Sequence, residues 1–138
     1  MATFNKFNSF VEALAEKTHN LGSDQLVVAL CAAANAPVAT NTKLSDLTQI
    51  SYTNLSSRNI TTSSSAQTSG TYKLILNDLT LSASGGSVAT FRYIVIYNDT
   101  ATNDELIGWY DYGSDVTLAS GQNLIIDFDG TNGALSIT

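Results

Sequence analysis

The spacing of hydrophobic residues near the start of the chain predicts one amphipathic helix. Apolar side chains fall at Phe4, Phe7, Val11 and Leu14, and the charged residues lie between them. Steps of three and four residues place such side chains on one stripe of a helix. A helix is therefore expected within residues 5–19.

Two local signals refine this helix and the element that follows it. Ser9 and Glu12 match a capping box, so the helix can begin as late as Phe10, with an ordered arm before it. His19 would then lie near the C-terminal end, where a cap or surface role is expected. Residues 25–33 form a continuous run rich in Val and Leu, which is typical of a strand buried on both faces.

The middle of the chain is more polar. The stretch after the buried strand contains the only proline and reads as a surface connection, with one short helical turn around residues 44–47. Residues 51–70 are dominated by Ser, Thr and Asn, which suits either weak edge strands or a mobile loop. Weak strands are the favoured reading.

From Tyr72 onward, short apolar runs alternate with turn residues. Seven strands are expected, at 72–76, 79–83, 91–97, 106–112, 116–118, 123–128 and 134–137. This spacing predicts a mainly β fold, an antiparallel β-sandwich of jelly-roll-like type with one N-terminal α-helix. The chain is read as a single domain, 1–138, with an arm and helix in 1–22 and the sandwich in 25–138.

Residues 91–97 and 106–112 predict an antiparallel hairpin whose register follows from one charged pair. If Tyr97 lies opposite Leu106, Arg92 lies opposite Asp111, the only charged residues of two apolar strands. The same register pairs Ile94 with Trp109, Ile96 with Ile107, Tyr93 with Tyr110, and Phe91 with Tyr112. The expected core residues are Ile94, Ile96, Ile107, Trp109, Leu124, Ile126 and Phe128.

The segment LIGWYDYGSD, residues 106–115, admits two interpretations. Aromatic rings beside carboxylates are typical of sugar-binding sites, so Trp109, Tyr110, Asp111 and Tyr112 could form a glycan platform. The same residues also suit the centre of a sheet. Strand alternation sends Trp109 to one face and both tyrosines to the other, which favours the sheet.

Composition changes the functional picture mainly through charge. Charged residues make up 13% of the chain, about half the usual share. The net charge is −6, and after residue 60 only Lys73 and Arg92 face eight acids. Such a surface repels phosphate backbones, so no nucleic-acid partner is expected. No apolar run is long enough for a membrane span and no signal peptide is evident, so folding in a cytoplasm is expected.

The residues that could support chemistry are few. A single histidine argues against a Ser-His-Asp triad, and Cys31 lies in an apolar run, where a small buried hydrophobe is expected. Residues 127–133 hint at a calcium loop but do not match an EF-hand, and a hairpin turn explains them better. No phosphate-binding glycine pattern occurs. No enzymatic activity, metal or cofactor is expected.

With these features in place, the chain resembles a family of small virion structural proteins of tailed bacteriophages. The resemblance covers most of the chain, through residues 3–24, 36–42, 84–100 and 106–137. The sequence departs from the family pattern at 51–65, where relatives are glycine-rich, and at Ala89-Thr90, where Gly-Pro is usual. These departures affect the expected loop conformations.

The resemblance implies a role in the virion, most specifically as a decoration or cement protein on the capsid exterior. The expected partner is the major capsid protein, and a homo-oligomer, with a trimer favoured, is expected because shells offer local three-fold positions. The alternatives are a tail or fibre component that binds a host-surface glycan, and a host-interaction factor made early in infection. The interface candidates are Phe4, Phe7, Val11, Leu14, Tyr93, Tyr110 and Tyr112.

Overall fold

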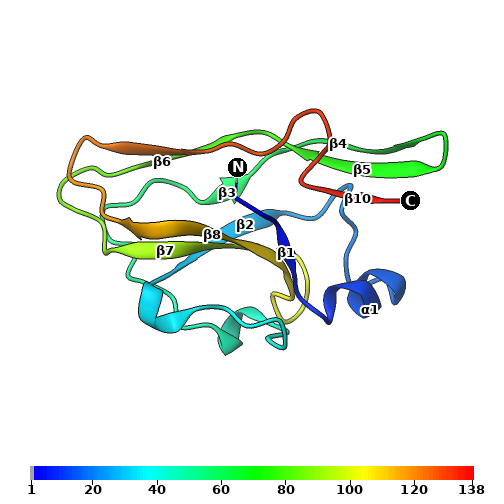
Figure 1. Ribbon diagram of the computed structural model, residues 1–138, viewed down its shortest axis with the longest axis horizontal. Coiled ribbons are helices and arrows are strands. Elements are labelled where there is room, and N and C mark those ends of the chain that lie inside the picture. The colour runs from blue at the N-terminus through cyan, green and yellow to red at the C-terminus, as the bar shows by residue number, and fades with distance from the viewer. Residues whose placement is uncertain (1) are drawn as a thin grey trace.

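The computed structural model describes residues 2–138 and consists mainly of antiparallel strands (Figure 1). The strands are β1 (Asn5–Lys6), β2 (Leu26–Cys31), β3 (Asn59–Ile60), β4 (Thr62–Thr68), β5 (Thr71–Leu76), β6 (Leu79–Ser82), β7 (Phe91–Asn98), β8 (Leu106–Val116), β9 (Asn123–Ile126) and β10 (Leu135–Ile137). The helices are α1 (Phe10–Ala15) and the short 3-10 turns η1 (Ala33–Asn35) and η2 (Leu44–Asp46). The mainly β, antiparallel architecture with one N-terminal α-helix, predicted from the sequence, is confirmed.

The strands form two layers. One layer is a five-stranded sheet in the order β1-β8-β7-β2-β3. The other contains two small sheets, β10-β5-β4 and β6-β9, in which β5 runs on into β6 while β9 and β10 return beside them. Figure 1 shows these small sheets stacked over the larger one, with the η1 and η2 connection on its outer side.

Strand β2 explains why residues 25–33 are apolar without alternation. All six of its residues are buried. Leu26, Val28 and Leu30 point into the main core between the layers, whereas Val27 and Ala29 join a second cluster on the opposite face of the sheet. A central strand with both faces covered needs apolar side chains at every position.

The second cluster lies under the connection that contains η1 and η2. Leu44 and Leu47 from this connection pack against it, and Phe7 is fully buried within it. The assignment of Phe7 to an interface was therefore wrong. Its ring lies 4.6 Å from that of Trp109 between centroids, so it fills a core position.

The N-terminal helix is shorter than the apolar stripe suggested. Helix α1 begins at Phe10 and is preceded by the arm strand β1. Of the two expected helix starts, near residue 5 or near Phe10, the later one is therefore confirmed. The capping box does not form, because the side chain of Ser9 makes no capping hydrogen bond. Of the stripe residues in α1, Leu14 is partly buried and Val11 is exposed, whereas Phe10, which is not part of the stripe, is buried.

Most of the predicted core residues are buried. Five of the seven, Ile94, Ile96, Ile107, Ile126 and Phe128, are between 1% and 7% exposed. Trp109 and Leu124 are partly buried and pack at the margins of the second and main cluster respectively. The polar segment 51–70 forms strands only in its second half, as β3 and β4.

The register of the β7–β8 hairpin departs from the prediction after its first pair. Tyr97 does lie opposite Leu106, but the next pair is Ile96 with Gly108, because Ile107 is accommodated in a bulge. Ile94 therefore faces Tyr110, Val95 faces Trp109, and Tyr93 faces Asp111. Both strand faces are apolar, so alternation could not reveal the extra residue.

Cys31 is buried as expected for a small hydrophobe. It is 0% exposed in the second cluster, and burial raises the pKa of its thiol to about 11. Because the thiolate is the reactive form, the folded protein is expected to react with a thiol reagent only as fast as it unfolds. Rapid modification in native buffer, measured with an aromatic disulfide reagent, would contradict this placement.

Candidate interaction surface

One side of the sandwich is left open between the edges of its two layers. In the larger sheet β1 is the edge strand, and β8 extends well beyond the two residues that pair with it. In the other layer β9 and β10 each have a neighbour on one side only within residues 2–138. Unpaired strand edges are places where another chain can add.

Two clefts lie along this open side. The first, here called the β9 cleft, has a volume of about 540 Å³ and lies between β8 and β9. The second, here called the helix cleft, has a volume of about 600 Å³ and lies between α1, β1 and β10. Phe4 lines both, so the arm separates them. The β9 cleft is lined by Ala2, Phe4, Ile94, Tyr110, Tyr112, Leu124, Ile125, Ile126, Asp127, Asp129, Gly133 and Ala134.

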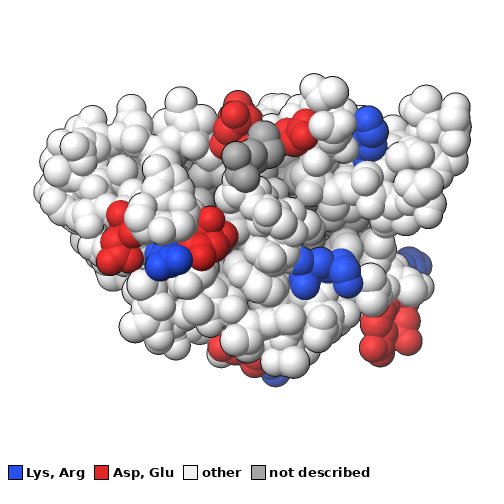
Figure 2. All heavy atoms as spheres, viewed as in Figure 1, with Lys and Arg blue, Asp and Glu red and all other residues white. Residues whose placement is uncertain are grey.

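The open side is unusually apolar for exposed surface. Five large hydrophobic side chains are strongly exposed in residues 2–138, and four of them, Val11, Tyr112, Ile125 and Ile137, line these two clefts. Each of the four is between 43% and 61% exposed. Figure 2, in the same view as Figure 1, shows the charged atoms in separate groups with uncharged surface between them. Clustered exposed apolar side chains of this kind are typical of an interaction surface.

The arm packs against a glycine in β8. The Phe4 ring packs 5.5 Å from the Tyr110 ring between centroids, and Asn5 lies opposite Trp109. A Cβ added at Gly108 would come within 2.2 Å of the Phe4 ring and 2.8 Å of the Asn5 carbonyl oxygen. The absence of a side chain at Gly108 therefore allows the arm to lie against the sheet.

The β9 cleft has acidic residues and no basic residue in its lining. Asp129 is held in a turn by backbone N–H donors of Asn132 and Thr131, and these bonds lower the pKa of its carboxyl. Asp127 is exposed beside it. Burial, with a smaller contribution from the charge of Asp129, raises the pKa of the Tyr110 hydroxyl to about 12. At neutral pH the cleft therefore combines apolar walls with negative charge.

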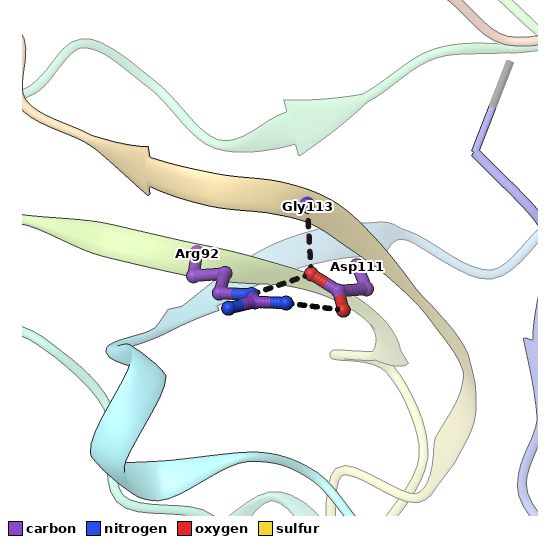
Figure 3. A network of polar contacts seen from close by, with 3 residues as sticks. All are labelled: Arg92, Asp111 and Gly113. Carbon is purple, nitrogen blue, oxygen red and sulfur yellow. Dashed lines mark hydrogen bonds and ion pairs between the residues drawn. The ribbon is translucent and has the colours of Figure 1, made fainter.

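The predicted charged pair forms, although not by direct opposition. Arg92 donates from Nε and Nη2 to the two carboxylate oxygens of Asp111 at 2.8 and 3.0 Å (Figure 3). The backbone N–H of Gly113 also donates to Asp111 at 2.8 Å, and together these bonds lower the pKa of that carboxyl. Gly113 has a φ of 93° in the bulged part of β8, and this bend brings Asp111 to Arg92. Asp111 is thus committed to a structural contact.

The single histidine belongs to a buried polar cluster rather than to a surface cap, so its expected role was wrong. His19 is 5% exposed, and its Nδ1 lies 3.0 Å from the side-chain nitrogen of Asn98. The side-chain oxygen Oδ1 of Asn98 accepts from the backbone N–H groups of Thr100 and Ala101, which leaves the side-chain NH2 to donate to His19 Nδ1 and to Asp24. His19 Nδ1 is therefore an acceptor, as in the neutral ring.

The burial of His19 predicts a loss of stability in mild acid. Desolvation lowers its pKa in the folded state, against the opposing charges of Glu105 and Asp24. A group whose pKa is lowered by folding contributes stability that is complete above its ordinary pKa of 6.5 and declines as the pH falls below it. Urea unfolding of the wild type and of His19→Gln at pH 7.5 and 5.5 should show a larger acid-induced loss in the wild type. Equal losses would contradict the assignment.

The open side contains most, but not all, of the interface candidates from the sequence. Phe4, Val11, Leu14, Tyr110 and Tyr112 line its clefts, and the last two share one cleft as strand alternation predicted. Tyr93 instead lies on the other face of the sheet, beside the second cluster. Sequence reasoning missed Ile125 and Ile137. Ile125 did leave a signal, because it is apolar at a position of β9 where alternation calls for a polar side chain.

Three further findings concern metal binding, membrane spans and similarity to known proteins. Within residues 2–138, no three His, Cys, Asp or Glu side chains gather closely enough to hold a metal ion. No helix in the same range has the length and apolar character needed to cross a membrane. Comparisons of the chain with models of protein families, with curated proteins and with solved structures gave no significant match.

Proposed function

We propose that the protein is a virion structural component of a tailed bacteriophage, most specifically a decoration protein that binds the capsid exterior and bridges neighbouring capsid subunits. The resemblance in residues 3–24, 36–42, 84–100 and 106–137 supports the phage assignment. The open side supports a binding role. Weak contacts by many copies on a repeating shell add up through multivalency, so no single interface needs to be strong.

The observation on which the proposal mainly rests is the gathering of exposed apolar side chains at free strand edges. Val11 and Ile137 flank the helix cleft, while Tyr112 and Ile125 flank the β9 cleft. Surfaces that remain in water do not normally keep such groups together, whereas the centre of an interface does. The open side is therefore assigned as the surface that faces the shell.

The experiment is a co-sedimentation of the purified protein with empty capsids and, separately, with purified tails of the phage that encodes it. Binding to capsids that is lost in Ile125→Lys is expected, because a charge would be placed in the interface. Val38→Lys is the matched control, since Val38 is 52% exposed and lies outside both clefts. Binding to tails but not to capsids would overturn the capsid assignment.

A second candidate is the glycan-binding tail or fibre component. The β9 cleft does bring two tyrosines, Tyr110 and Tyr112, beside the carboxylates of Asp127 and Asp129. Trp109 and Asp111 do not line this cleft, so the platform differs from the one that residue types alone suggested. Saturation-transfer NMR with host surface polysaccharide distinguishes the two candidates. A signal that disappears in Tyr112→Ala would favour the glycan role.

A further inference from the structure

We infer that the β9 cleft binds an extended segment of a partner protein, which adds as a strand to the free edge of β9 and places a basic side chain against Asp127 and Asp129. The inference rests on the proposed function for the partner's identity as a capsid protein. The binding mode follows from the geometry of the open side. This geometry concerns the β9 cleft alone, and the expected occupant is an extended protein segment.

The main-chain part of this inference comes from the edge of β9. Residues Asn123–Ile126 pair with β6 on one side only, in regular antiparallel register from Ser82 to Leu79. The strand therefore presents main-chain donors and acceptors along its outer edge. Addition of an extended peptide to such an edge is a recurring mode of protein recognition.

The apolar part comes from the side chains on either side of that edge. Leu124 and Ile126 point toward the core, while Ile125 points outward and is 61% exposed, the highest value among the exposed large hydrophobic side chains of residues 2–138. Across the cleft lies Tyr112, which is also exposed. An added strand with alternating apolar residues would direct one set of side chains toward Tyr112 between the layers and place the other set beside Ile125 on the outer face.

The charge requirement comes from the lining. Asp127 and Asp129 border the β9 cleft, and no Lys or Arg lines it. Lys73 lies close enough to Asp129 to have a small electrostatic effect on it, but its ammonium group donates to the carbonyl oxygen of Thr131. A Lys or Arg on the incoming segment would meet the negative charge of both aspartates inside the cleft.

The same charges argue against a second copy as the occupant. In a symmetric antiparallel pairing centred on Asn123–Ile126, Asp127 of each copy would lie opposite Gln122 of the other. No Lys or Arg occurs after Arg92, so neither β9 edge would bring a basic side chain to these carboxylates. The partner is therefore a different chain with a basic residue.

The chain's own arm illustrates the mode of binding. Residues Asn5 and Lys6 add to the edge of β8, and the Phe4 ring enters the space between the layers. Ala2, also in the arm, contributes to the lining of the β9 cleft. The open side thus already accepts one extended segment, in cis, at the neighbouring edge.

The test uses a random heptapeptide library displayed on beads and selected against the immobilised full chain. Enriched peptides should combine alternating apolar residues with Lys or Arg, and should shift the backbone amide NMR signals of residues 123–126. The best peptide should bind Asp127→Asn/Asp129→Asn about tenfold more weakly, with Asp99→Asn as the unaffected control. Methylation of its alternate backbone nitrogens should abolish binding, because the strand hydrogen bonds are lost.

Several results would overturn the inference. They are the absence of enriched peptides, enrichment without basic residues, tolerance of backbone methylation, and a dimer in sedimentation that Ile125→Lys abolishes. The last result would identify a second copy as the occupant. If the peptide test fails but the protein is present in virions, this binding mode alone is rejected. If the peptide test succeeds but the protein is absent from virions, the proposed function alone is rejected.

Discussion

Replacement of Phe7 by alanine is expected to lower the free energy of unfolding by about 3–5 kcal/mol. The ring is fully buried and packs against Trp109 in the cluster that closes the outer face of the large sheet. Truncation removes apolar burial and leaves a cavity that the sheet and the overlying connection cannot fill. Urea denaturation followed by the fluorescence of Trp109, and independently by circular dichroism, measures the change.

Val11 is the matched control for this prediction. It occupies the same apolar stripe in the sequence, but it is 53% exposed on α1. Val11→Ala is expected to change stability by less than about 0.5 kcal/mol. Equal losses in the two variants, or a Phe7→Ala protein as stable as the wild type, would contradict the distinction between core and open side.

The second large effect is expected at Gly108. In Gly108→Ala the new methyl group would overlap the Phe4 ring and crowd the Asn5 carbonyl oxygen, so the arm must leave the sheet or the strand must shift. A loss of about 1–3 kcal/mol is expected from such overpacking. Amide hydrogen exchange at Asn5 and Lys6 should accelerate as the β1 pairing is lost.

Gly130→Ala provides the control, because no heavy atom lies within 4 Å of a Cβ built there. Phe4→Ala should partly suppress the effect of Gly108→Ala, since it removes the ring but leaves the Asn5 carbonyl oxygen in place. A Gly108→Ala protein with wild-type stability and unchanged exchange at Asn5 would contradict the seating of the arm.

Much of the strand arrangement could be predicted from local patterns. The continuous apolar run at 25–33 identified β2, because a strand covered on both faces has no wet side. Alternation at Leu124, Ile126 and Phe128 identified the inward face of β9 and the segment after it. In both cases the burial of a strand can be predicted from the residues of that strand alone.

The register of the hairpin could be predicted only in part. The pair Tyr97–Leu106 was found, but Ile107 and Gly108 both fall on the side of the main core, opposite Ile96. The arm lies against Gly108 at this bulge, and it comes from a part of the chain about a hundred residues away. A bulge leaves no trace in the alternation of two strands that are apolar on both faces.

Burial that depends on other elements was also missed. Helical spacing predicts an interface position for Phe7 on the apolar stripe and a cap or surface position for His19 near the helix end. Phe7 is covered instead by the connection with Leu44 and Leu47, and His19 by its contacts with Asn98 and Phe10. Their environments are created by tertiary packing, which helical spacing does not describe.

A cryo-electron microscopy reconstruction of the virion, at a resolution that traces side chains, is the most direct test of the capsid role. We expect density for this chain on the capsid exterior, with Tyr112, Ile125 and the β9 edge against a capsid subunit. A particle that lacks the chain, or that holds it with the open side facing solvent, would contradict this role.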